Sequence, residues 1–232
     1  MSAATLLSRF ALPSQCEVCR AWNGHRLCDD CVSRFGAPRP RCVACALPVP
    51  AGVERCGECL RDPPPFEHTV CAADYGFPWD RLVSAFKFDA QVDLAGPLAG
   101  RLAAAVRAAG RPLPDLVLPV PLAPRRLAER GYNQAWELAR RVARDLGLPA
   151  QADALARPLE TAHQADLPRA ERMRNLRAAF VVEPRARGRL AARRVALVDD
   201  VLTTGATARE ATRALLAAGA AAVQVWVLAR TP

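Results

Sequence analysis

An apolar run that ends in two adjacent carboxylates constrains this chain more than any other segment. It reads Val195-Ala-Leu-Val-Asp-Asp-Val-Leu-Thr-Thr-Gly-Ala-Thr207. Four consecutive apolar residues are typical of a strand that is buried on both faces, as in a parallel sheet. Gly205 permits a positive φ or a close backbone approach, and residues 206–218 have the spacing of a helix that stops at Gly219. The segment therefore predicts a strand, a tight loop and a helix.

The residues at this predicted loop indicate a ligand site. Open parallel sheets bind ligands beyond the carboxyl ends of their strands, where Asp199 and Asp200 stand. Amides at a helix start favour an anion, and Thr203, Thr204 and Thr207 add hydroxyl donors. Phosphate in the loop, with a polyol or a cation on the carboxylates, describes a site for ribose 5-phosphate. A strand end with a threonine N-cap and no ligand is the alternative, although two unpartnered acids would be costly there.

Strand and helix patterns alternate along the C-terminal part of the chain. Short strand or helix pieces are expected at 70–77 and 82–88, strands at 115–122, 178–182, 194–198 and 222–228, and helices at 95–109 and 133–146. This alternation predicts an α/β fold with a parallel sheet flanked by helices.

The amino-acid composition of the chain changes at Asp62-Pro-Pro-Pro65, since eight of the nine cysteines precede this segment. A proline run suits a boundary, so we expect a cysteine-rich module at 1–65 and a second domain at 66–232.

Four Cys-x-x-Cys pairs dominate the N-terminal module, and they are Cys16/Cys19, Cys28/Cys31, Cys42/Cys45 and Cys56/Cys59. Each pair forms a knuckle, and two knuckles complete a tetrahedral zinc site, so eight thiolates predict two structural zinc ions. A disulfide framework is the alternative, but it requires an oxidising compartment and the sequence has no export signal. Sequential pairing of the knuckles closes shorter loops than a cross-brace, and we prefer it.

Several further residues are candidates for contact with an anionic ligand. Arg125, Arg126 and Arg130 could clamp a diphosphate because guanidinium forks match phosphate oxygens, or they could belong to a solvated loop. Asn133 and Gln134 follow them, and Asn133 is also a suitable helix N-cap. Lys87 is the only lysine among 32 basic residues, which indicates a specific role, and a solvated surface lysine is the equally weighted alternative.

Composition narrows the class of protein. The net charge of +9 suits an anionic partner such as phosphate or nucleic acid, although the arginine bias weakens that inference. The sequence contains no run of about 18 apolar residues and no secretory signal pattern. We therefore expect a cytoplasmic protein without a membrane span.

The aspartate-threonine segment resembles the phosphoribosyl pyrophosphate motif of type I phosphoribosyltransferases. Together with the cysteine pairs, the whole chain resembles the ComF family of competence-associated proteins, including its double-zinc-ribbon and gluconate-uptake-like members. Further matching segments are Leu118-Pro-Val-Pro-Leu122, Arg130-Gly-Tyr-Asn-Gln-Ala135, Phe86-Lys87-Phe88 and the set Arg157, Gln164, Arg172 and Asn175.

This resemblance implies a type I phosphoribosyltransferase-like sheet behind a double zinc ribbon. Asp199 and Asp200 would hold the ribose hydroxyls, and the residues of the phosphate loop would be Val201, Leu202, Thr203, Thr204, Gly205, Ala206 and Thr207, with the 5-phosphate on 203–207. The loop after Pro121 would approach pyrophosphate, residues 157–177 would form a cover, and Mg²⁺ would be held mainly by pyrophosphate and water.

Two functions follow from the resemblance. The first is Mg²⁺-dependent binding of phosphoribosyl pyrophosphate with transfer of the phosphoribosyl group, in a protein that acts in DNA uptake. The second is a non-catalytic protein that binds single-stranded DNA or a competence helicase, although an aromatic content of 6% is low for a base-stacking surface.

Overall fold

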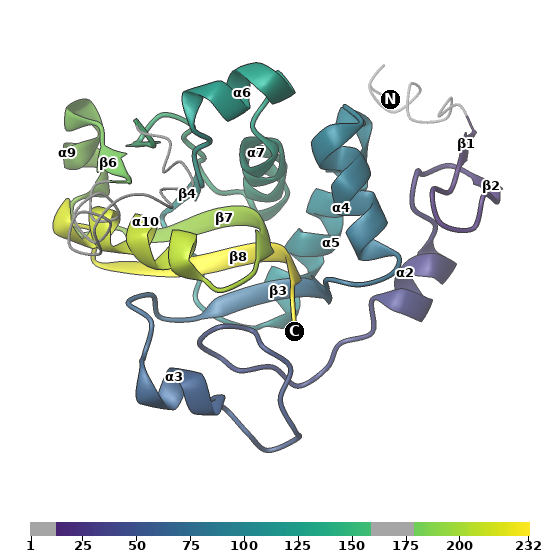
Figure 1. Ribbon diagram of the computed structural model, residues 1–232, viewed down its shortest axis with the longest axis horizontal. Coiled ribbons are helices and arrows are strands. Elements are labelled where there is room, and N and C mark those ends of the chain that lie inside the picture. Colours follow the sequence, from purple (N-terminus) through teal and green to yellow (C-terminus); the bar gives the residue numbers. More distant parts are fainter. Residues whose placement is uncertain (1–12, 159–178) are drawn as a thin grey trace, which may run out of the picture. The chain divides into compact units, whose positions relative to one another are not determined.

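The computed structural model describes residues 13–158 and 179–232 (Figure 1), and the chain forms two compact units, Met1–Pro38 and Arg39–Pro232. In the first unit, β1 (Ser14–Gln15) pairs antiparallel with β2 (Trp22–Asn23), and α2 (Asp29–Phe35) follows. Residues 159–178, which include Gln164, Arg172 and Asn175 and most of the expected cover, lie outside the described residues. No described helix is both long enough and apolar enough to cross a membrane.

The second unit is built on a four-stranded parallel sheet in the order β3-β8-β7-β4. Its strands are β3 (Thr69–Asp74), β4 (Leu116–Pro119), β7 (Arg194–Leu202) and β8 (Ala222–Arg230). All nine residues of β8 are buried, which explains why this strand lacks the polar alternation of a half-exposed one. The α/β class with a parallel sheet behind a cysteine-rich module, as predicted, is confirmed.

Helices cover both faces of this sheet (Figure 1). The helices α5 (Ala95–Ala108) and α7 (Gln134–Leu146) lie on one face, and α10 (Ala206–Ala217) lies on the other with the small hairpin of β5 (Leu155–Ala156) and β6 (Val181–Val182). The buried stripe of α7 has the i, i+3, i+4 spacing that the sequence predicted. Gly147, with φ 69°, ends this helix in the left-handed conformation.

The structure resolves or corrects several local expectations. The ambiguous segment 82–88 belongs to a helix, α4 (Trp79–Phe88), followed by η1 (Val92–Leu94). Another helix, α6 (Pro124–Arg130), stands where the sequence suggested a loop, with proline at its start and Gly131 at φ 76° after its end.

Two strands differ in length from the prediction. The expected strand 178–182 is only two residues long, and η2 (Pro184–Ala186) and α9 (Arg187–Leu190) follow it. The strand predicted at 194–198 continues to Leu202 because β8 pairs with it along that length.

The eight paired cysteines form two clusters in sequential order, namely Cys16, Cys19, Cys28 and Cys31 in the first unit and Cys42, Cys45, Cys56 and Cys59 in the second. Within each cluster all four sulfur atoms lie within 4.8 Å of one another. Sγ atoms of Cys19 and Cys28 are 3.7 Å apart, and those of Cys45 and Cys56 are also 3.7 Å apart. Tetrahedral Zn–S bonds of about 2.3 Å place sulfurs about 3.8 Å apart, whereas a disulfide requires about 2.05 Å. The clusters are therefore structural zinc sites.

The backbone prepares these thiols for a metal ion. Burial raises the pKa of the Cys16 thiol, but backbone N–H groups of Cys19, Cys28 and Val18 outweigh it and lower that pKa to about 6. At Cys42 burial is likewise outweighed by N–H groups of Cys56, Cys45 and Ala44, and its pKa falls to about 7. Since the thiolate is the form that binds zinc, each cluster contains one sulfur that is readily ionised at neutral pH.

Protein purified under reducing conditions should contain two zinc ions per chain by elemental analysis, one for each cluster. Cys19→Ser should lower the content to about one, because three thiolates hold zinc less tightly than four. Cys71→Ser is the matched control and should leave the content unchanged, because Cys71 belongs to neither cluster. Loss of zinc from the Cys71 variant, or intramolecular disulfides in place of metal, would contradict the assignment.

Candidate functional site

The carboxyl end of β7 carries the two predicted aspartates. Neighbouring residues of a strand point to opposite faces of the sheet, so Asp199 and Asp200 address different surroundings. Asp200 is buried, with 7% of its surface exposed, and Asp199 is half-buried. One carboxylate oxygen of Asp199 accepts a hydrogen bond from the backbone N–H of Asp200 at 2.8 Å. This hydrogen bond stabilises the Asp199 carboxylate, but it gives neither side chain a partner of opposite charge.

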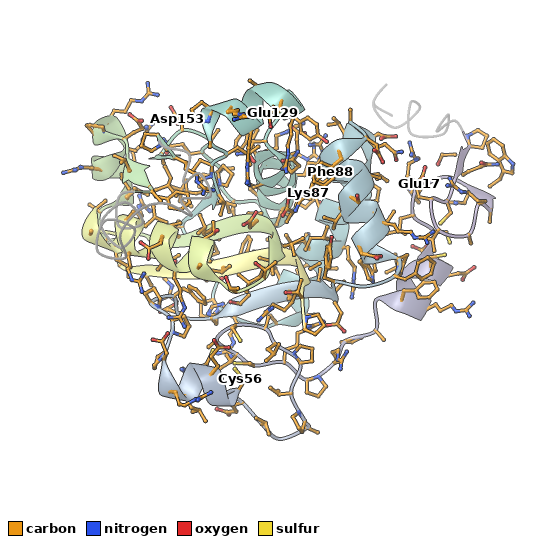
Figure 2. The ribbon with its side chains drawn as sticks, in the orientation of Figure 1. Glu17, Cys56, Lys87, Phe88, Glu129 and Asp153 are labelled. Carbon is orange, nitrogen blue, oxygen red and sulfur yellow. The ribbon has the colours of Figure 1, made fainter. Side chains whose placement is uncertain are left out.

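Lys87 supplies the partner of Asp200. Its Nζ lies 2.8 Å from Asp200 Oδ1, and the two side chains are 19% and 10% exposed. Lys87 stands in the last turn of α4, and Figure 2 shows it beside the exposed Phe88. Burial of a single charge would be costly, and this ion pair offsets that cost for both groups. The only lysine of the chain thus lies at the predicted site.

Asp199 has a perturbed acidity. Burial raises the pKa of this carboxyl to about 7, and the negative charge of Asp200 adds to the rise. The backbone N–H of Asp200 and the positive charges of Lys87 and Arg157 oppose it without cancelling it. A carboxyl that titrates near neutral pH at a strand end is typical of a functional site.

The loop after β7 has the geometry of an anion site. Thr203 and Thr204 are exposed, and Gly205 adopts φ 78° at the start of α10. The Thr204 hydroxyl oxygen accepts the Ala206 N–H at 3.4 Å. The backbone N–H groups of Thr203, Thr204 and Gly205 donate to no acceptor among residues 13–158 and 179–232. Open amides at a helix start favour a phosphate group.

The turn between α6 and α7 packs against the Lys87 segment. The Tyr132 hydroxyl donates to the carbonyl of Phe86, and their rings are 5.9 Å apart. The Arg130 guanidinium lies over the Phe88 ring at 5.0 Å, and its Nη1 donates to Gln134 Oε1 at 3.1 Å. These contacts bring together two of the segments that carried the family resemblance.

Asn133 and Gln134 have distinct surroundings at the start of α7. Asn133 is the N-cap, since its Oδ1 accepts the Trp136 N–H at 3.3 Å, and its Nδ2 donates to the Val120 carbonyl at 3.1 Å. It thereby fixes the loop after β4 as well as the helix. Gln134 is 1% exposed, and its Nε2 makes no hydrogen bond within the described parts of the chain. A ligand group in this region would satisfy that donor.

Arg125 and Arg126 stand apart from this group of residues. Both are exposed on α6, and Arg125 pairs with Glu129 at 2.9 Å. Neither contacts the aspartates among the residues that the structure describes. Their role as a diphosphate clamp stays a prediction.

Arg230 was not among the site residues predicted from the sequence. Its guanidinium is 7% exposed and donates to the carbonyls of Leu202 and Cys45. Arg230 is the last residue of β8, two positions beyond the segment 222–228 that was predicted as a strand. The signal was a charged residue next to a mostly apolar segment, since a buried arginine there requires acceptors.

Comparison with known proteins gives consistent results. A sequence model described as the double zinc ribbon domain matches residues 7–60. The DNA utilization protein YhgH of Escherichia coli K12 is 37% identical over 227 residues, which is 95% of this chain and 98% of that protein. Competence protein F of Haemophilus influenzae is 36% identical over 208 residues, which is 88% of this chain and 90% of that protein.

Solved structures with weaker similarity include two proteins of phosphoribosyl chemistry. One is the glutamine phosphoribosylpyrophosphate amidotransferase of B. subtilis, at 21% identity and a TM-score of 0.42, over 59% of this chain and 27% of that chain. Another is a purine phosphoribosyltransferase of Pyrococcus horikoshii, at 22% identity and a TM-score of 0.36, over 59% of this chain and 71% of that chain. The identity of 36–37% to YhgH and competence protein F, over 88–95% of this chain, shows that the chain belongs to their family, the ComF family.

Proposed function

We propose that the carboxyl end of β7 binds phosphoribosyl pyrophosphate with Mg²⁺ and transfers the phosphoribosyl group to an acceptor. The observation that carries this proposal is the Lys87–Asp200 ion pair beside the phosphate loop. One end of the site offers open amides and hydroxyls, which suit a 5-phosphate. The other end offers carboxylates, which suit ribose hydroxyls, with a lysine in reach of the leaving group.

Each group would have its own task in the reaction. The C1–O bond to pyrophosphate breaks, a bond from C1 to the acceptor nucleophile forms, and the acceptor gives up its proton to the site or to solvent. Positive charge develops on the ribose ring, and Asp199 and Asp200 would stabilise it. Lys87 would exchange Asp200 for pyrophosphate oxygens, and Arg130 and the Gln134 amide would add donors.

Magnesium fits the donors present. Mg²⁺ prefers oxygen ligands and retains several waters, and the Asp199 carboxylate provides oxygens for those waters. When bound, the ion would neutralise charge on the departing pyrophosphate.

A second proposed function is binding of single-stranded DNA or of a helicase in the competence machinery of the cytoplasm. The names of the relatives, DNA utilization protein and competence protein F, favour a role in DNA uptake. Trp22, 69% exposed in the first unit, would offer its ring for stacking with a base. This function involves a different unit, so both functions can belong to one protein.

Changing Asp199 and Asp200 together to Asn keeps their shape and removes both charges. Affinity for phosphoribosyl pyrophosphate with Mg²⁺, measured by isothermal titration, should fall at least about tenfold, or about 1.4 kcal/mol. Single-stranded DNA should bind as before or slightly more tightly, since two repulsive charges are lost. The matched control changes the exposed Asp145 and Asp153 to Asn and should leave phosphoribosyl pyrophosphate affinity unchanged. Equal affinity of the parent and the Asp199/Asp200 variant would overturn the proposal.

The pH dependence of binding tests the acidity of Asp199. Its pKa of about 7 means that the carboxyl gains a negative charge as pH rises through neutrality. Ionised oxygens accept hydroxyl hydrogen bonds more strongly, so affinity should rise up to about tenfold between about pH 6 and 8. Because ligand phosphates also titrate, the measured quantity is the ratio of parent to Asp199→Asn affinity. A ratio that stays constant across this range would contradict the assignment.

A further inference from the structure

The second cysteine site lies directly beside the phosphate loop. A cavity of about 20 Å³ separates them, and it is lined by Cys45 and Cys59 on one side and by Leu202, Thr204 and Gly205 on the other. Both groups of residues belong to the same compact unit. A structural metal site this close can act on the loop if bonds connect the two.

Arg230 provides the first connection. Its Nε donates to the Cys45 carbonyl at 3.0 Å, and its Nη1 donates to the Leu202 carbonyl at 3.2 Å. The Leu202 carbonyl also accepts the Thr231 N–H at 3.1 Å. One buried guanidinium therefore joins a zinc ligand residue to the last residue of β7.

This bond fixes the first donor of the loop. The Leu202 carbonyl and the Thr203 N–H belong to one planar trans peptide and point in opposite directions. Holding the carbonyl toward Arg230 therefore directs the Thr203 N–H away from it, and that N–H is among the open donors of the loop. Rotation of this peptide would remove the donor from the phosphate position.

Arg209 provides the second connection, at the other end of the loop. Its backbone N–H donates to the Gly205 carbonyl at 2.9 Å, within the first turn of α10. Its side chain reaches the carbonyl of Asp62 at 2.8 Å and the Asp62 carboxylate at 3.2 Å. Asp62 directly follows α3 (Gly57–Arg61), the helix that carries Cys59.

The acceptors of both arginines depend on the second cysteine site for their positions. Cys45 belongs to the Cys42/Cys45 knuckle of the second cluster, in which the Ala46 N–H donates to the Cys42 carbonyl at 2.8 Å. The Asp62 N–H donates to the Glu58 carbonyl at 2.8 Å, at the end of the α3 turn. Metal bound by the thiolates holds knuckle and helix together.

We propose that Arg209 and Arg230 are positioning residues that fasten both ends of the phosphate loop to the second zinc site, so that metal in this site maintains the loop's affinity for a 5-phosphate. This inference rests on the proposed function for its ligand. The first zinc site lies in the other compact unit and has no part in this network.

The test compares Arg209→Ala with Arg213→Ala, a matched control. Arg213 lies on the same helix and pairs with Glu210 on that helix. Ribose 5-phosphate and Mg²⁺-pyrophosphate are titrated separately by calorimetry. Arg209→Ala should weaken ribose 5-phosphate about fivefold, because the loop loses one of its two attachments, and leave pyrophosphate affinity unchanged. Arg213→Ala should change neither affinity.

Ligand-free hydrogen exchange at residues 203–207 tests the attachment independently of binding. Exchange should accelerate in Arg209→Ala and Cys45→Ser but not in Arg213→Ala or Cys19→Ser. Parent-like exchange and parent-like ribose 5-phosphate affinity in Arg209→Ala would overturn the inference, as would equal loss of both ligands. If exchange responds as expected but the parent protein binds no ribose 5-phosphate, the attachment stands and the proposed function fails.

Discussion

Asp199 and Asp200 lie near the carboxyl end of β7, a largely buried strand, and buried carboxylates require partners of opposite charge or hydrogen-bond donors. Other elements of the second unit supply these partners. Asp200 forms an ion pair with Lys87, and this pair requires that the last turn of α4 lies at the carboxyl edge of the sheet. The position of α4 depends in turn on the turn between α6 and α7, where the Tyr132 hydroxyl donates a hydrogen bond to the Phe86 carbonyl. Asp199 lacks such a strong counter-charge, and burial leaves its pKa near 7. The same constraint thus explains both the packing of these elements and the raised pKa of Asp199.

The two zinc sites serve the fold in different ways. The first organises a unit too small to bury a core of its own, which is a common use of structural metal. The second is bonded into the sheet domain, where the Thr69 hydroxyl also donates to the Ala44 carbonyl at 2.6 Å. The double zinc ribbon is continuous in the sequence, but its two cysteine clusters belong to different compact units. Residues 39–62 belong to the unit of the sheet, which they contact.

Local patterns predicted much of this structure from the sequence. The Cys-x-x-Cys knuckles, the buried strands and the helix ended by Gly147 depend on spacing within a few residues, and all are present. The length of β7 could not be predicted, because pairing with β8 extends it past the aspartates to Leu202. Nor could the Lys87–Asp200 pair, since the partners are distant in sequence and only the packing of α4 brings them together. As the only lysine, Lys87 could be singled out in the sequence, but its partner Asp200 could not be identified from it.

Backbone NMR during titration with ribose 5-phosphate is the sharpest test of phosphate binding at the loop after β7, because it locates the phosphate on individual amides. If the loop holds the 5-phosphate, the largest shifts will occur at Thr203, Thr204, Gly205 and Thr207, with smaller changes at Asp199 and Asp200. These shifts should saturate with a single dissociation constant. Saturable binding that leaves residues 203–207 unperturbed, with shifts confined to the cysteine-rich unit or to α6, would contradict it.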